Sequence, residues 1–216
     1  MSGAVRELHL SYGGTFDPVH RGHLEVARSV ARQLGSVVHL VPCADPPHRA
    51  PPVATAVQRA HMLELAIAGD ACLALDRREQ RRVGASYTID TLTELRGELG
   101  EQCAIGCVIG ADAFRGLPTW REWRRLFDLA HVLVLTRPGH VLDDLSADLQ
   151  GETESRRISD AAALRHAAAG HLLELSVPEW DVSSTGVRRA LAAGERPSDA
   201  VPRVVLDWIL ARGLYR

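Results

Sequence analysis

Short apolar runs alternate along the chain with longer segments in which apolar side chains recur at helical spacing. The short runs predict strands at residues 8–12, 37–41, 72–75, 104–109, 131–136 and 172–177. The periodic segments predict helices at residues 21–34, 56–68, 88–99, 120–129, 185–193 and 202–211. The pattern weakens between residues 140 and 170, and no element is predicted there.

Strands that alternate with helices of this length indicate an α/β protein with a parallel sheet and right-handed crossovers. No linker, repeat or low-complexity tract divides the sequence. We therefore expect residues 1–216 to form one domain, a doubly wound parallel sheet with helices on both faces. Residues from about 180 to 216 would form a helical C-terminal cap. Ligands of such sheets bind beyond the carboxyl ends of the strands, so functional motifs should follow strands or open helices.

The composition narrows the classes of function. Hydrophobic residues make up 46% of the 216 residues, charged residues 24%, and the net charge is -2. Such a balance gives no broad basic field, so we expect no nucleic-acid partner. No apolar run approaches the roughly 20 residues of a membrane span, and no signal-peptide pattern opens the chain. Four cysteines without a CxxC pair suggest reduced thiols in a cytoplasmic protein.

The sequence contains no lysine, so all 25 basic residues are arginines. This excludes the phosphate-binding loop that ends in Gly-Lys-Ser/Thr, and it excludes Schiff-base chemistry on a lysine. Any phosphate site must therefore use arginine, histidine, hydroxyl groups and main-chain N–H groups.

The strongest motif, GGTFDPVHRGH at residues 13–23, follows the first predicted strand. Gly13 and Gly14 let the backbone come close to a ligand, and Gly22 leaves space for a bulky group. His20 and His23 lie three residues apart at the start of a helix, whose N–H groups and dipole favour an anion. The motif predicts a phosphate site. A tight turn with exposed histidines and a zinc site without an obvious third ligand are the alternatives.

A second motif, VSSTGVR at residues 182–188, opens a predicted helix near the C-terminus. Its hydroxyl residues suit the N-cap. Arg188 in the first turn or so opposes the helix dipole unless an anion is bound there. The family resemblance given below implies that this segment folds over the histidine turn as the other half of a phosphate clamp. A capped surface helix is the alternative.

Two further segments suit the binding of an acceptor. The sequence PCADPPHR at residues 42–49 predicts a rigid loop that presents His48 and Arg49 to a phosphate, unless it is only a surface loop. The sequence SYTIDT at residues 86–91 starts a helix at which the N–H groups of Tyr87 and Thr88 suit a carboxylate. A ligand with an amide in place of the carboxylate would pair less well with these two N–H donors. A plain capping segment is the alternative.

The last candidates follow the strand at residues 104–109. Asp112 could accept hydrogen bonds from ribose hydroxyls, and Trp120 could stack on a pyridine ring. Trp123 is expected in the core. Asp17, beside Pro18 in the turn, is given no metal role.

These motifs together resemble those of the nucleotidyltransferase superfamily with the (H/T)xGH signature, and most closely the bacterial nicotinate-nucleotide adenylyltransferases. The matching segments are GGTFDPVHRGH, PPHR, SYTIDT, GAD with LPTW, and VSSTGVR, from residue 13 to the C-terminal GLYR. Two positions depart from the family pattern. Val182 replaces an isoleucine, and Arg49 replaces a lysine, which keeps the charge but changes its geometry.

The resemblance implies a Rossmann-like fold and transfer of the adenylyl group of ATP to nicotinate mononucleotide, with release of pyrophosphate. Because the acceptor phosphate is largely a dianion at pH 7, direct in-line attack needs no protein base. Mg²⁺ is expected to come with ATP rather than in a dedicated protein site. Nicotinamide mononucleotide or phosphopantetheine as acceptor, a non-catalytic nucleotide-binding domain and a homo-oligomeric state are left open.

The resemblance also implies site residues. The catalytic residues would be His20, His23 and Arg188. The ATP-binding residues would be Gly13, Gly14, Thr15, His20, His23, Gly110, Asp112, Ser183, Ser184, Thr185 and Arg188. The mononucleotide-binding residues would be Phe16, His48, Arg49, Ser86, Tyr87, Thr88 and Trp120.

Overall fold

A computed structural model describes residues 5–47, 50–139 and 142–216. Its strands form a single sheet of seven, all paired in parallel, in the order β3-β2-β1-β4-β5-β7-β6. The strands are β1 (Leu8–Gly14), β2 (Val38–Pro42), β3 (Leu73–Leu75), β4 (Ala104–Gly110), β5 (His131–Thr136), β6 (Arg157–Ile158) and β7 (Leu172–Ser176). The predicted α/β class with a parallel sheet is confirmed.

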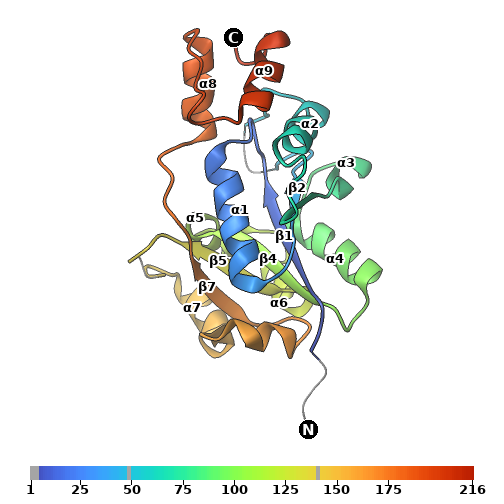
Figure 1. Cartoon of the computed structure of the whole chain (residues 1–216). Helices are drawn as coiled ribbons and strands as arrows, with labels where there is room; N and C mark the ends of the chain where they lie inside the picture. Colours follow the sequence, from blue (N-terminus) through green and yellow to red (C-terminus); the bar gives the residue numbers. More distant parts are fainter. Residues whose placement is uncertain (1–4, 48–49, 140–141) are drawn as a thin grey trace.

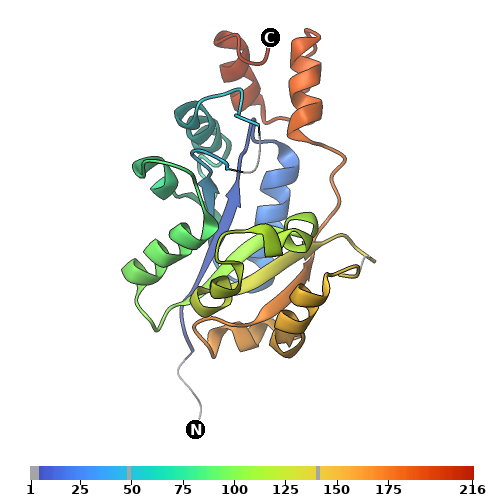
Figure 2. The same cartoon turned by 180° about the vertical axis from the view of Figure 1, so that it is seen from behind.

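Helices cover both faces of this sheet. Figure 1 shows α1 across one face, and Figure 2, seen from behind, shows α4 and α6 across the other. The α-helices are α1 (Arg21–Leu34), α2 (Ala56–Ala66), α3 (Arg78–Arg81), α4 (Thr88–Leu99), α5 (Ala111–Arg115), α6 (Leu126–Leu129), α7 (Ala147–Thr153), α8 (Ser184–Ala192) and α9 (Arg203–Ala211). The last two lie beyond one end of the sheet, at the top of both views. None of the helices in the described part is long and apolar enough to cross a membrane.

Alternate residues of the strands supply two apolar cores. In β5, Leu133 and Leu135 join the core that includes buried residues of α1, α2, α8 and α9. Val132 and Val134 of the same strand face the core that includes α4, α5 and α6. A strand buried on both faces reads as a continuous apolar run, which is why β4 and β5 were visible in the sequence.

The helix predicted at residues 120–129 is wrong. Trp120 has an extended backbone, and Glu122 has a left-handed one with φ of 51°, so a helix cannot pass through them. The chain instead forms two 3₁₀ turns, η1 (Leu117–Thr119) and η2 (Trp123–Arg125), before the four-residue α6. This break leaves Trp123 in the core, as expected, and Trp120 on the wall of a cleft.

The weakly patterned residues 140–170 do contain structure in their described part. They form α7, the 3₁₀ turns η3 (Glu154–Arg156) and η4 (Ala161–Arg165), and the two-residue edge strand β6. Elements of this length are too short to show a hydrophobic period, and the same holds for α3 and α5.

The strand order reverses at the centre of the sheet. From β1 the chain moves outward to β2 and β3, then returns to the other side of β1 as β4. This is a topological switch point, and crevices form there beyond the carboxyl ends of the strands. The described residues of the predicted motifs lie near that end.

Candidate active site

A cleft of about 1090 Å³ lies at the carboxyl ends of β1 and β4. The structure brings nearly all of the predicted site residues to its walls. They are Gly13, Gly14, Thr15, Phe16, His20, His23, Ser86, Tyr87, Thr88, Gly110, Asp112, Trp120, Ser183, Ser184, Thr185 and Arg188. His48 and Arg49 lie outside the described residues.

The two histidines of the first motif cap each other at the start of α1. The main-chain N–H of His23 donates to Nδ1 of His20 at 3.4 Å, and the N–H of His20 donates to Nδ1 of His23 at 3.3 Å. Their rings stack with centroids 3.6 Å apart. Because each Nδ1 accepts a hydrogen bond, the proton of each neutral ring is on Nε2. Each ring therefore offers one Nε2–H donor.

Burial keeps both rings neutral. It lowers the pKa of His20 from 6.5 to about 4, and burial together with the neighbouring His20 ring lowers the pKa of His23 well below its ordinary value. At pH 7 the pair therefore acts as two aligned neutral donors rather than as two cations.

The glycines of this motif serve packing as well as access. A Cβ on Gly13 would meet no atom within 4 Å, so the cleft side of that residue is open. On Gly14 it would lie 2.7 Å from the Phe16 ring, and on Gly22 it would lie 2.9 Å from Val182. The space that Gly22 provides is thus filled by the second motif. Phe16 is only 2% exposed, which limits what its side chain can offer a ligand.

The second motif folds over the first, as expected from the sequence. Ser183 caps α8 by accepting a hydrogen bond from the N–H of Gly186. Ser184 Oγ donates to the carbonyl of Pro18 at 3.0 Å. Arg188 Nη1 donates to the carbonyl of Asp17 at 2.6 Å, and Nη2 donates to Thr185 Oγ1 at 3.2 Å. The α8 helix is therefore attached directly to the loop between β1 and α1.

Asp17 connects this loop to two further segments. Its carboxylate accepts hydrogen bonds from the N–H groups of Val53 at 2.8 Å and Ala54 at 3.1 Å, and from the Tyr215 hydroxyl at 2.7 Å. Asp17 is 5% exposed. Three donors on one buried carboxylate fix the loop relative to α2 and the C-terminus.

Arg59 of α2 joins the loops on the other side of the cleft. The residue is fully buried, and its guanidinium donates to the carbonyls of Thr15 at 2.7 Å, Ala44 at 3.1 Å and Ala54 at 3.2 Å. Burial lowers its pKa, although nearby acidic groups oppose this. A buried positive charge under the loops of the cleft favours an anionic ligand.

The sequence analysis assigned no role to Asp17, Arg59 or Tyr215. A signal for Arg59 was present, because it shares a helical face with Met62 and Leu63, both fully buried. The residues Asp17 and Tyr215 are 198 positions apart, so no local sequence pattern predicts their contact.

On the acceptor side, Ser86 joins two loops. Its Oγ accepts hydrogen bonds from the N–H groups of Ala44 at 3.1 Å and Asp45 at 3.2 Å. Tyr87 occupies the N-cap of α4 without a side-chain cap bond, and its ring lies under the Arg121 guanidinium at 5.0 Å. Thr88 is the first residue of the helix. The start of a helix carries the positive end of its dipole, so this end suits an anion or a carbonyl oxygen.

The remaining predicted contacts, Trp120 and Asp112, also line the cleft. Trp120 is half-buried, with its ring packed against the core behind it. Asp112 is exposed and forms an ion pair with Arg115 at 3.2 Å. Its carboxylate is therefore open to a hydroxyl group of a ligand, in competition with that arginine.

A smaller cavity of about 230 Å³ adjoins the cleft and shares His20 and His23 with it. The half-exposed Trp180 lines it, together with Arg137 and Glu179, which form an ion pair at 2.5 Å. An aromatic wall beside a phosphate site suits a flat base. Among the described residues, no group of three or more His, Cys, Asp or Glu side chains could hold a metal ion.

Comparisons with known proteins give the family of the chain. The model of the family described as cytidylyltransferase-like matches residues 11–190. A probable nicotinate-nucleotide adenylyltransferase of Marinobacter nauticus is 47% identical over 96% of each chain, and one of Stenotrophomonas maltophilia is 45% identical over 98% of each. The fold resembles the Plasmodium falciparum nicotinic acid mononucleotide adenylyltransferase complexed with NaAD. The TM-score is 0.74 at 16% identity, over 97% of this chain and 98% of that one.

Proposed function

The chain belongs to the cytidylyltransferase-like family and, within it, to the nicotinate-nucleotide adenylyltransferases, and from this premise we propose how its cleft performs the reaction. ATP and nicotinate mononucleotide bind side by side. An oxygen of the mononucleotide phosphate attacks the α-phosphorus of ATP in line. The bond from that phosphorus to the β-phosphate oxygen breaks, which gives the nicotinate dinucleotide and pyrophosphate.

We propose that the ATP phosphates lie between the two motifs. The Nε2–H groups of His20 and His23 donate to phosphate oxygens, joined by Thr15 and the first turn of α8 with Ser183, Ser184 and Thr185. Arg188 supplies the positive charge. The observation that carries this proposal is the pair of neutral histidines, whose Nδ1 atoms are held by the main chain so that both Nε2–H donors are fixed. Fixed donors stabilise charge as it develops on the leaving pyrophosphate.

The chemistry requires no base from the protein. The second pKa of a phosphate monoester is about 6, so the acceptor is largely a dianion at pH 7. Neutral histidines with lowered pKa values then serve as donors throughout the reaction. The cleft contributes by holding two polyanions in line and by offsetting their charge, with buried Arg59 under both loops.

We propose that the adenine ring occupies the smaller cavity against Trp180, since that cavity opens beside the two histidines. The ribose reaches Gly110 and Asp112. Mg²⁺ enters with ATP and would offset part of the phosphate charge. The Asp17 carboxylate already accepts three hydrogen bonds, so it is not available as a ligand for the ion.

We propose that the mononucleotide occupies the opposite half of the cleft. Its pyridine ring stacks on Trp120, and its carboxylate accepts from the N–H groups at Tyr87 and Thr88, where α4 begins. Phe16 contributes through its main chain, because its side chain is buried. His48 and Arg49 stay predicted contacts of the mononucleotide phosphate.

The test is a turnover assay on the purified protein with ATP, nicotinate mononucleotide and Mg²⁺. The proposal predicts pyrophosphate and the dinucleotide in equal amounts, and neither when the mononucleotide is left out. Absence of both products from a folded sample would contradict it.

A further inference from the structure

The C-terminus of the chain contacts the loop that carries the first motif. Beyond α9, which ends at Ala211, the chain turns back on itself through hydrogen bonds from the N–H groups of Gly213 and Leu214 to the last turn of the helix. This turn directs Tyr215 inward. Its ring joins the core on the α1 side, and the residue is 6% exposed.

The backbone of Tyr215 is in an unfavourable conformation. Its φ is 64°, in the left-handed region that is unfavourable for a residue with a side chain. The buried ring and the hydrogen bond of its hydroxyl to Asp17 Oδ1 at 2.7 Å hold it there. Burial, and then the hydrogen bond to Asp17, raise the pKa of this hydroxyl, so it stays a donor at any physiological pH.

The carboxylate that Tyr215 contacts lies next to the phosphate clamp. Arg188 Nη1 donates to the main-chain carbonyl of Asp17 at 2.6 Å and lies 4.0 Å from its Oδ2. A carboxylate offers about four acceptor positions, and Tyr215, Val53 and Ala54 fill three of them. These donors are neutral and fixed, so Arg188 keeps only a long ion pair with the carboxylate, at 4.0 Å from Oδ2.

The other nearby arginine cannot take the place of Tyr215. The guanidinium of Arg59 already donates to the carbonyls of Thr15, Ala44 and Ala54. If the hydroxyl were lost, Arg188 is the cation close enough to move onto the under-satisfied carboxylate. Its guanidinium would then turn from the cleft toward the protein interior.

We propose that Tyr215 is a positioning residue for the phosphate site, which keeps Arg188 directed at ATP by satisfying Asp17. This rests on the proposed role of Arg188 in binding the ATP phosphates. Tyr215 touches neither substrate in this account. Its effect on ATP binding passes entirely through Arg188. We therefore expect Tyr215 to have no effect on the binding of the mononucleotide.

The experiment is a double-mutant cycle on the full chain, with KM for ATP measured at saturating nicotinate mononucleotide. The variants are Tyr215→Phe, Arg188→Ala and both together, with Arg216→Ala as the matched control at the neighbouring, exposed residue. A partly unfolded sample lowers the apparent kcat but not KM, so KM separates a positioning role from a loss of folded protein.

We expect Tyr215→Phe to raise KM for ATP roughly tenfold, equivalent to about 1.4 kcal/mol, and to leave KM for the mononucleotide within about twofold. In the Arg188→Ala background the same change should alter KM for ATP less than about twofold, since coupled residues are not additive. Arg216→Ala should match the parent.

Two results would overturn the inference. One is an unchanged KM for ATP in Tyr215→Phe, and the other is an equal rise in both backgrounds, which a purely structural role would give. If Arg188→Ala itself leaves KM for ATP unchanged, the proposed phosphate role of Arg188 is wrong as well. If Arg188→Ala raises KM and Tyr215→Phe does not, only the role of Tyr215 is refuted.

Discussion

His23 carries two hydrogen-bonding roles that substitution can separate. Its Nδ1 accepts from the main-chain N–H of His20, which caps α1, and its Nε2–H faces the cleft. The amide of asparagine reaches the position of Nδ1, and that of glutamine reaches the position of Nε2. His23→Asn therefore keeps the cap and removes the donor. His23→Gln keeps a donor and weakens the cap.

The two roles differ in magnitude. Loss of one fixed donor to a developing anion lowers kcat by about 10²–10³, which is about 2.7–4 kcal/mol of transition-state stabilisation. Loss of a helix cap costs about 0.5–2 kcal/mol of stability and leaves the chemistry of the remaining folded molecules unchanged. Both variants also lose the edge contact of the His23 ring with Phe16, at 5.0 Å between centroids. That shared cost cancels between them.

The assay is kcat at saturating ATP, with unfolding by urea measured on the same samples. We expect His23→Asn to lose about 10²–10³ in kcat with less than about 1 kcal/mol of stability. His23→Gln should keep kcat within about tenfold of the parent and lose more stability. His166→Asn, on an exposed histidine outside the cleft, is the control and should change neither quantity. The reasoning is refuted if His23→Gln is the less active of the two.

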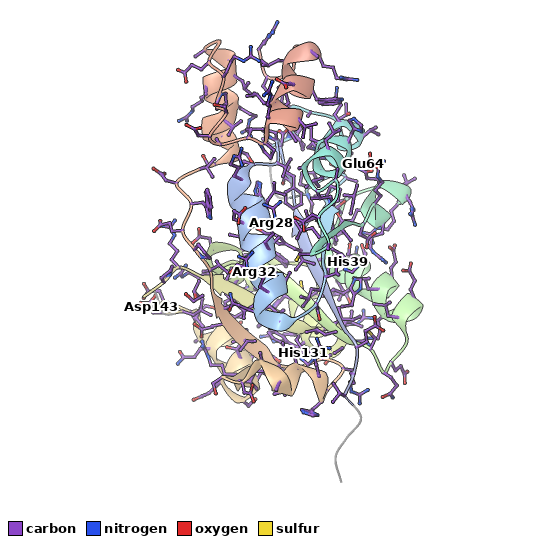
Figure 3. All side chains as sticks on the ribbon, in the orientation of Figure 1. Arg28, Arg32, His39, Glu64, His131 and Asp143 are labelled. Carbon is purple, nitrogen blue, oxygen red and sulfur yellow. The ribbon has the colours of Figure 1, made fainter. Side chains whose placement is uncertain are left out.

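Three further predictions follow from the cleft and the core. Trp120→Ala should raise KM for the mononucleotide about tenfold with less than twofold effect on KM for ATP, because the base–aromatic stack is worth about 1–3 kcal/mol; equal effects in steady-state kinetics would count against stacking. Arg59→Met should lower the free energy of unfolding by about 3 kcal/mol or more, since it leaves three carbonyls that Arg59 bonds without their donor. The control, Arg32→Met on the exposed side of α1 (Figure 3), should change it by under about 0.5 kcal/mol. Comparable losses for both variants in urea titrations would refute the structural role of Arg59. Stability should be constant above pH 6.5 and fall toward pH 4, because burial lowers the pKa of His131 from 6.5 to about 4 and a proton favours the unfolded chain in that window, by about 3 kcal/mol at most from this residue, with further losses from His20 and His23; urea titrations that give a flat profile from pH 6.5 to 4.5 would contradict this.

The position of His131 shows why such effects are separate from catalysis. Figure 3 places it near the far end of the sheet from α8 and α9. It is fully buried, and its ring contacts the carbonyl of Ala167 and the N–H of His171. Acid should therefore destabilise the fold partly through a residue that never meets a substrate.

The sequence predicted what local patterns determine. The β1 strand, which ends in Gly13 and Gly14, and the α1 helix lie within 27 residues, so residues 13–23 could be placed at a strand-to-helix turn. The association of Ser184 with Pro18 was expected from the resemblance alone, since these residues are 166 positions apart.

What the sequence could not predict depends on tertiary packing. Trp120 and Glu122 lie in a segment with helical spacing, yet burial of Trp123 and Leu126 favoured a broken segment over a continuous helix. Tyr215 carries no local signal either, because its partner lies near the other end of the chain.

The central claim is that the start of α4 selects nicotinate mononucleotide as the acceptor by binding its carboxylate. The most direct measurement is a competition assay, in which the purified protein receives ATP with nicotinate mononucleotide and nicotinamide mononucleotide at equal concentrations. The ratio of the two dinucleotide products is then read by chromatography. We expect the nicotinate product to exceed the nicotinamide product at least about tenfold, because a carboxylate accepts from both N–H groups of the helix start and an amide uses them less well. Equal amounts, or an excess of the nicotinamide product, would contradict the account.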